Sequence, residues 1–390
     1  MAPAGRPSNR TLEILEELVA QRTSSDSGNL EIIDYIESLL APLGAELIRT
    51  YDESGSKTNL LARLGPDHGA GVILSGHTDV VPVSGQEWSF DPWALTEDGD
   101  RLYGRGSCDM KGFLACMLSV VERMDVSTLS SPLYLAFSYD EEIGLRGVRP
   151  LIEDFNGRGL EAALCVVGEP TEMQVAVGHK SILQGTCTVT GSEAHSSLEP
   201  HAANALYGAA RVLTRLEEME REREENGPFD PGYGVPHSTV HAATIRSGVA
   251  LNIVPRTAEF GFEFRCIPGE DPRTLLEDVR EFAETQVVPR LRRTAPEADV
   301  RFRVAMEGPG LDTASDSPEA RRAMRATGVG QAAPPRMPFA TEAGLFQRAG
   351  IPTVLCGPGD IAQAHKPDEY VTLEQLARCE AFLTRLLSED

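Results

Sequence analysis

Hydrophobic positions in the first 43 residues recur at helical spacing. Residues 11–43 are predicted to be helical, with one apolar face formed by Leu12, Leu15, Leu18 and Val19. A second helix carries Ile32, Ile33, Ile36, Leu39 and Leu40. Short apolar runs, typical of buried strands, follow at residues 72–75, 133–139, 163–167 and 353–356, and a helical stretch covers 113–124. Strands that alternate with helices predict an α/β domain with a parallel or mixed sheet.

The middle of the chain follows a different pattern, in which apolar and polar residues alternate. Strands are predicted at residues 181–190, 238–246, 257–266 and 299–305, and helices at 202–223 and 272–288. This β-α-β-β-α-β order is that of a ferredoxin-like unit. We therefore expect an inserted domain at residues 180–308 and a catalytic domain formed by residues 1–179 and 309–390. A length of 390 residues suits two domains, because single cores stop growing near about 250–300 residues.

Composition limits the possible partners. Acidic residues outnumber basic ones, 59 to 36, for a net charge of -23, which argues against binding to nucleic acid or to an anionic membrane. No apolar run approaches the roughly 18 residues of a membrane span, and residues 1–10 lack the apolar segment of a secretory signal. The seven cysteines are widely spaced and form no C-x-x-C pair, which favours a reducing compartment. We expect a cytoplasmic protein.

Residues capable of chemistry follow the strand-like runs. The run at 72–75 precedes His77 and Asp79, the run at 133–139 precedes Glu141 and Glu142, and the run at 163–167 precedes Glu169. Open α/β sheets place their sites at the carboxyl ends of strands. These side chains are therefore expected to converge at one edge of the sheet.

Two more segments add candidate ligands. Asp109 lies in the glycine-rich stretch 104–112, and His365 follows the run at 353–356 and a Gly-Pro-Gly turn. Each segment alone is equally typical of a helix start or a solvated loop, but together they supply two imidazoles and several carboxylates. Such mixed ligands suit Zn²⁺, and less often Co²⁺ or Mn²⁺. A different hypothesis makes Cys108 a nucleophile, although it requires an adjacent activating base that the sequence does not specify.

Several motifs resemble one family of enzymes. Residues 77–82 (His-Thr-Asp-Val-Val-Pro), 104–112, 140–142 and 168–171 are similar, in the same order, to motifs of the dinuclear zinc amidohydrolases. That family includes acetylornithine deacetylase, succinyl-diaminopimelate desuccinylase and glutamate carboxypeptidase. Residues 340–347 and 356–371 resemble the acetylornithine deacetylase branch, whereas the desuccinylase branch usually has Gly-Gly-Thr-Ser-Asp in place of residues 340–344.

The resemblance implies a catalytic domain of the zinc-aminopeptidase type with two divalent metal ions, zinc or alternatively cobalt. His77 and Glu169 would bind one ion, Glu142 and His365 would bind the other, and Asp109 would bridge both. Glu141 would be the general base. Asp79 would orient His77, since a carboxylate can accept the second ring N–H of a metal-bound histidine.

The same resemblance assigns the inserted domain to a lid that also forms a homodimer. His195 would reach across the dimer interface into the partner's active site, and Asn252 and Arg265 would hold the substrate. Arginine suits a substrate carboxylate because its planar fork binds both oxygens. Glu342 is our candidate to pair with a substrate amine.

The predicted reaction is metal-dependent hydrolysis of the amide bond of an N-acyl amino acid. N²-acetylornithine, cleaved to ornithine and acetate in arginine biosynthesis, is the leading substrate. The alternatives are acetylcitrulline, acetyl-diaminobutyrate, succinyl-diaminopimelate or, for a glutamate-carboxypeptidase-like enzyme, a peptide. A non-catalytic binding relative would show gaps in the ligand set, but that set is complete and Glu141 is present.

Overall fold

The chain folds into two compact units in the computed structural model, which describes residues 5–330 and 333–388. The first unit contains the residues up to Gly178, the segment Leu311–Arg336 and the residues from Thr341 onward. The second contains His179–Gly310 and the short segment Met337–Ala340. The chain passes between them at the two-residue strands β8 (Gly178–His179), β15 (Leu311–Asp312) and β16 (Arg336–Met337).

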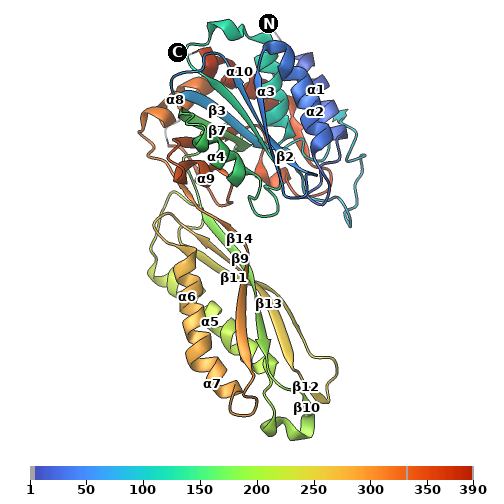
Figure 1. Ribbon diagram of the computed structural model, residues 1–390, viewed down its shortest axis with the longest axis vertical. Coiled ribbons are helices and arrows are strands. Elements are labelled where there is room, and N and C mark those ends of the chain that lie inside the picture. The colour runs from blue at the N-terminus through green and yellow to red at the C-terminus, as the bar shows by residue number, and fades with distance from the viewer. Residues whose placement is uncertain (1–4, 331–332, 389–390) are drawn as a thin grey trace. The chain divides into compact units, whose positions relative to one another are not determined.

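A six-stranded mixed sheet forms the centre of the first unit (Figure 1). Its spatial order is β1 (Glu46–Tyr51), β2 (Thr58–Leu64), β6 (Leu133–Ser138), β3 (Gly71–His77), β7 (Ala162–Pro170) and β17 (Thr353–Gly357). Strands β6, β3, β7 and β17 are mutually parallel, whereas β2 is antiparallel to both of its neighbours. The prediction of a mixed sheet is confirmed. Its four parallel strands end at one edge, where the candidate ligands were expected.

Helices cover both faces of this sheet. One face carries α1 (Asn9–Ala20), α2 (Leu30–Leu40), α3 (Lys111–Arg123), α8 (Pro318–Thr327) and α10 (Leu373–Ser388), whose apolar residues share a core with alternate strand positions. The other face carries α4 (Val148–Gly157) and α9 (Ala343–Arg348). There the ring of Phe155 packs edge-on against that of Tyr134, with 5.1 Å between centroids. Residues 111–121 of α3 are all buried, so this helix is fixed directly behind the site.

Shorter elements complete the first unit. A three-stranded sheet contains β18 (Tyr370–Thr372), β5 (Arg101–Tyr103) and β4 (Thr96–Asp98). Three short helical turns are η1 (Ala41–Leu43), η2 (Val126–Thr128) and η5 (Ile361–Gln363). Among the described residues, no helix of either unit combines the length and apolar content needed to cross a membrane.

The second unit has the predicted ferredoxin-like order. Its elements are β9 (Ser181–Thr190), α5 (Ala205–Asn226), β11 (Thr239–Ser247), β13 (Thr257–Cys266), α6 (Pro272–Phe282), which continues through η4 (Ala283–Val287) into α7 (Val288–Leu291), and β14 (Asp299–Gly308). They form an antiparallel sheet in the order β11-β13-β9-β14. One face is covered by the helices (Figure 1), because alternate residues of β9 and β13 are apolar and buried. At a tip of this unit, β10 (Ala194–His195) pairs with β12 (Ile253–Val254) and precedes η3 (Ser196–His201).

Candidate metal centre

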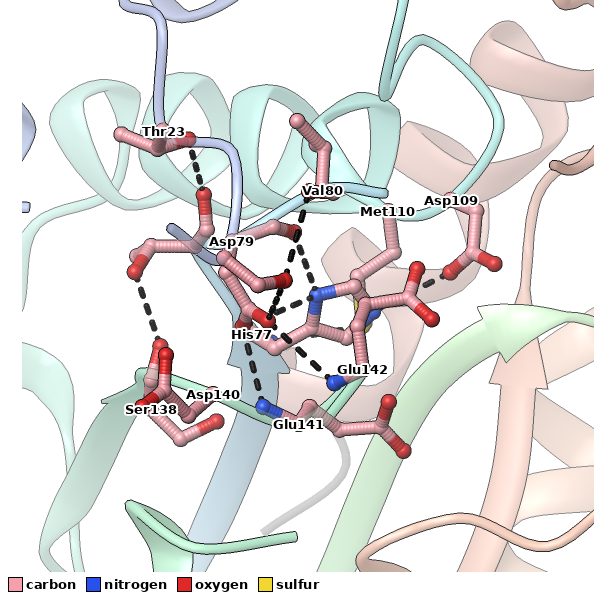
Figure 2. A network of polar contacts seen from close by, with 12 residues as sticks. Thr23, His77, Asp79, Val80, Asp109, Met110, Ser138, Asp140, Glu141 and Glu142 are labelled. Atoms are coloured by element: carbon pink, nitrogen blue, oxygen red, sulfur yellow. Dashed lines mark hydrogen bonds and ion pairs between the residues drawn. The ribbon is translucent and has the colours of Figure 1, made fainter. Parts of the chain in front are cut away.

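The ends of three neighbouring parallel strands bring the candidate ligands together. Figure 2 shows His77 with Asp109 and Glu142. His77 is the last residue of β3, and it pairs in register with Ser138 at the end of β6, two residues before the segment Asp140–Glu142. Glu169 lies near the end of β7, on the other side of β3. The glycine before it is required by close packing, since a Cβ at Gly168 would lie 2.0 Å from the Phe113 ring. The order of the strands therefore places residues that are far apart in the sequence next to one another at this edge of the sheet.

Asp79 fixes the orientation of the His77 ring through its main chain. Nδ1 of His77 lies 2.8 Å from the carbonyl oxygen of Asp79, while the nearest oxygen of the Asp79 carboxylate is 3.7 Å away. The expected contact thus forms to the carbonyl rather than the carboxylate. The carboxylate instead accepts the backbone N–H groups of Glu141 and Glu142 at 3.1 and 3.2 Å, since buried N–H donors require acceptors. Nε2 of His77 is left to face the site.

Asp109 stands between the two candidate histidines. One carboxylate oxygen lies 3.1 Å from Nε2 of His77, and the other lies 3.3 Å from Nε2 of His365. Nε2 of His365 is also 3.1 Å from Oε1 of Glu142. The peptide bond between Asp109 and Met110 is cis. A carboxylate that presents separate oxygens to two imidazoles has the geometry needed to bridge two cations.

The donor set fits divalent metal ions. Potential ligand atoms of His77, Glu141 and Glu169 lie within 4.8 Å of one another, and so do those of His77, Asp109 and Glu142. Oε1 of Glu169 is buried and has no hydrogen-bond partner, an arrangement that is costly for a polar atom unless a cation or donor occupies the adjacent space. Imidazole nitrogen and carboxylate oxygen are the ligands that zinc and similar ions prefer. The general-base role of Glu141, which lies among these atoms, stays a prediction.

Electrostatics at the site favour a cation. Burial and the neighbouring Glu169 raise the pKa of Glu141 well above its usual range, and burial and Asp109 do the same for the pKa of Glu169. Burial would lower the pKa of His77, but the contact with Asp109 and the surrounding carboxylates raise it. Contacts with Asp109 and Glu142 raise the pKa of His365 to about 10. Burial and the concentration of carboxylates raise the pKa values of Glu141 and Glu169, and the same carboxylates raise those of His77 and His365. Bound divalent cations would relieve this negative potential.

Glu342 is enclosed by protein beneath the strands of the metal centre. Its side chain is fully buried at the N-terminus of α9 and accepts hydrogen bonds from Oγ of Ser75 at 2.6 Å and Oγ of Ser138 at 2.7 Å. Those serines belong to β3 and end β6, the strands that lead to the metal centre. A role in pairing with a substrate amine does not fit this burial.

The second unit places two of its three candidates side by side. His195 on β10 pairs with Ile253, and the N–H of Ser196 donates to the carbonyl oxygen of Asn252 at 2.9 Å. Both His195 and Asn252 are exposed. Arg265 lies on β13, where Nε is 2.6 Å from Oε1 of Glu263. Roles for these residues at the metal centre stay predictions.

Cys108 is not an activated nucleophile. Its side chain is fully buried, and Sγ donates to the carbonyl oxygen of Asp360 at 3.4 Å. Burial and the negative charges of Glu369, Asp109 and Asp360 raise the pKa of the thiol well above its usual value. A catalytic thiol needs the opposite shift, so the cysteine-hydrolase hypothesis is wrong.

Sequence reasoning missed a buried ion pair beside the site. Nη1 of Arg105 lies 2.7 Å from Oε2 of Glu369, and each side chain is 1% exposed. Arg105 lies in the glycine-rich segment of Asp109, and Glu369 lies four residues after His365. The only sequence signal was that both residues fall inside motifs that carry ligands.

Fold and site together define a metal-dependent hydrolase with room for two divalent ions. The model of Peptidase family M20/M25/M40 matches residues 73–389, and the chain belongs to this family. It is 37% identical over 384 residues to acetylornithine deacetylase of Myxococcus xanthus, with 96% of each chain covered. It is 31% identical over 368 residues to the acetylornithine deacetylase of Aliivibrio fischeri strain MJ11, covering 94% of this chain and 93% of that one.

Solved structures of more distant proteins share the fold. An M20 family metallo-carboxypeptidase from Sulfolobus solfataricus superposes with a TM-score of 0.78 at 18% identity, covering 97% of this chain and 99% of that one. A dinuclear metal-binding peptidase of the M20 family from Bacillus subtilis superposes with a TM-score of 0.70 at 16% identity, with 97% of each chain covered. The resemblance stated from the motifs is thereby confirmed at the level of family and fold.

Proposed function

We propose that the protein removes the acyl group from an N-acyl amino acid and that its substrate is N²-acetylornithine, which yields ornithine and acetate in arginine biosynthesis. One observation carries the reaction class: the carboxylate oxygens of Asp109 face His77 and His365 separately, at 3.1 and 3.3 Å, and a buried Glu141 lies beside them. Similarity to deacetylases over 96% of the chain supports the substrate.

Chain residues perform the proton transfers in the proposed mechanism. Two bound cations would supply Lewis acidity, which lowers the pKa of a water molecule and polarises the amide carbonyl. The carboxylate of Glu141 takes a proton from that water and delivers it to the leaving amine. Hydrogen bonds from its own N–H and that of Glu142 to Asp79 hold the turn in place while the carboxylate changes its protonation state.

We assign zinc as the metal, with cobalt as the alternative. The donors at the site are two imidazoles and several carboxylates, and mixed nitrogen and oxygen ligands suit both ions. Metal analysis of the protein as purified, together with reconstitution of the metal-free protein with each ion, decides between them.

We place the protein in the cytoplasm. All seven cysteines are buried as free thiols. Unpaired cysteines in this number fit a reducing compartment.

We also propose that the second unit forms a homodimer and provides His195 to the partner's active site. Large apolar residues are exposed near the β10-β12 tip: the exposed fractions are 53% for Leu198, 82% for Val249 and 102% for Leu251. Exposed apolar residues that cluster on a surface mark an interface. Asn252, beside His195, and Arg265 are assigned to the substrate.

Mixing two inactive variants tests this arrangement. Glu141→Gln and His195→Ala protomers, unfolded together and refolded in equal amounts, should regain roughly a quarter of wild-type activity, because half the dimers are mixed and each has one complete site. Activity no higher than the mean of the two parent variants, or full activity from a monomer, would refute the contribution in trans.

Amine release from a substrate panel tests the proposed function. The panel is N²-acetylornithine, acetylcitrulline, acetyl-diaminobutyrate, succinyl-diaminopimelate and a dipeptide, each assayed with zinc, with cobalt and after chelation. Metal-dependent release that is fastest from N²-acetylornithine supports the proposal. Faster release from another N-acyl amino acid keeps the reaction and replaces the substrate, and release from the dipeptide alone favours a peptidase, the activity named for the Sulfolobus structure.

A further inference from the structure

The Glu369 carboxylate organises the loop that carries Asp109. Oε1 accepts the backbone N–H groups of Cys108 and Asp109, both at 3.0 Å, and Oε2 accepts that of Gly106 at 3.0 Å. The φ of Gly106 is 81°, a conformation that favours glycine. One buried side chain therefore fixes three backbone donors within four residues of a loop that contains no helix or strand, and the last donor belongs to Asp109, the candidate bridging residue.

Arg105 neutralises this buried carboxylate and extends the network. Its Nη1 donates to Oε2 of Glu369 at 2.7 Å, and its Nη2 donates to Oε1 of Gln86 at 2.5 Å. The guanidinium carbon lies 4.9 Å from the centroid of the Trp88 ring. Both charged side chains are 1% exposed, so loss of either partner leaves an uncompensated buried charge.

The other end of the network reaches the backbone at His365. Nε2 of Gln86 donates to the His365 carbonyl oxygen at 2.9 Å, and Nη1 of Arg105 lies 3.4 Å from the carbonyl oxygen of Lys366. The His365 side chain is 52% exposed and its φ is 63°, so packing alone does not hold it. Its position relative to Asp109 depends on Gln86, Arg105 and Glu369.

From these contacts we infer that Arg105 and Glu369 are positioning residues that set the spacing of Asp109 and His365, and thereby the affinity for the ion that His365 binds. The inference rests on the metal assignment of the proposed function but on no particular substrate. Neither residue belongs to the candidate ligand groups. Interactions behind the ligands typically change metal affinity by about 10–100-fold.

Zinc titration of the metal-free protein by calorimetry tests the inference. In Glu369→Gln, the amide NH₂ must face either Arg105 and the N–H of Gly106 or the N–H groups of Cys108 and Asp109, because only the amide oxygen can accept. We expect about 10–100-fold weaker binding of one zinc ion per chain and a change of less than about threefold for the other. The visible spectrum of the cobalt-loaded variant should also change, since it reports ligand geometry. No substrate is needed, so failure of the acetylornithine assay leaves this result interpretable.

Glu380→Gln is the matched control. Glu380 on α10 is also a largely buried carboxylate in the first unit, where it accepts the backbone N–H of Ser8 at 3.2 Å and pairs with Arg123 at 3.1 Å. The control should lower thermal stability and leave both zinc affinities unchanged. Unchanged affinities in Glu369→Gln, or equal losses in the two variants, would overturn the inference. If Glu369→Gln does not fold, Gln86→Ala is tested in its place. Weaker binding at one zinc site, with unchanged thermal stability of the metal-free protein, supports the inference. Wild-type affinity at both zinc sites rejects it.

Discussion

The carboxylate of Asp79 accepts a hydrogen bond from the backbone N–H of Glu141 at 3.1 Å. The contact joins the end of β3 to the turn after β6, and Asp79 also holds the His77 ring through its carbonyl oxygen at 2.8 Å. One residue thus positions a candidate metal ligand through its main chain and the candidate base through its side chain. The two functions are separable by substitution, because a change of side chain leaves the carbonyl in place.

Asp79→Asn should therefore reduce kcat more than metal affinity. The amide has one acceptor oxygen, so it cannot serve the N–H groups of both Glu141 and Glu142, and we expect kcat to fall about 10–100-fold. Zinc affinity at His77 should change less, since the carbonyl contact persists. Steady-state kinetics and zinc titration measure the two effects. Asp100→Asn, at a side chain that is 82% exposed, is the control. An equal loss of zinc affinity and of kcat would show that the side chain and the carbonyl of Asp79 do not act separately.

Glu141→Gln and Glu142→Gln should fail in different ways. If Glu141 transfers the proton, its amide variant keeps two metal ions and loses about 10²–10⁴-fold in kcat. Glu142 contacts His365 at 3.1 Å, so its amide variant should lose one ion. Metal content measured beside kcat distinguishes them. A Glu141→Gln protein that binds a single ion would show that Glu141 is a ligand.

The variant Glu342→Gln tests whether the charge of this buried carboxylate contributes to zinc affinity. Burial raises the pKa of Glu342, the hydroxyl groups of Ser75 and Ser138 lower it, and its charge interacts with His77. A glutamine preserves the packing but removes that charge, so zinc affinity should fall roughly tenfold. Because the side chain is fully buried, activity on acetylornithine and on a neutral acetyl amino acid should fall by the same factor. Selective loss of the cationic substrate would restore the substrate-amine hypothesis.

Much of the geometry of the candidate site was predictable, because its candidate ligands follow apolar strands. His77 and Glu169 end or nearly end buried runs, and a parallel sheet brings such positions to one edge. The ion pair between Arg105 and Glu369 was not predictable, since 264 positions separate two charged residues whose patterns indicate only exposed loops. The contact between the Asp79 carbonyl oxygen and His77 was also not predictable, because every residue type carries the same main-chain carbonyl group.

The loop between the first two helices is another feature that periodicity did not locate. Residues 11–43 are apolar at helical spacing, but the structure ends α1 at Ala20 and starts α2 at Leu30. The intervening loop packs against the site: Oγ1 of Thr23 donates to the carbonyl oxygen of Thr78 at 2.5 Å. Tertiary hydrogen bonds to the loop after β3 determined this interruption.

A buried histidine in the second unit should make the protein less stable in acid. His179 is fully buried, its Nδ1 lies 2.9 Å from the Lys180 carbonyl oxygen, and Nε2 has no hydrogen-bond partner. Burial lowers its pKa from 6.5 to about 4. Between those values the unfolded chain binds a proton that the folded chain does not, so the free energy of unfolding rises with pH. The contribution is complete above pH 6.5 and is lost as pH falls toward 4.

The variant His179→Gln removes this titration. Its destabilisation relative to wild type should be largest near pH 7 and should shrink by up to roughly 3 kcal/mol by pH 4. Urea unfolding of the metal-free proteins, followed by far-ultraviolet circular dichroism at several pH values, measures the difference. The same substitution at His68, whose side chain is 82% exposed, should leave the pH dependence of wild type unchanged. A constant gap between His179→Gln and wild type from pH 7 to 4 would show that the buried ring is protonated in the folded state as readily as in the unfolded chain.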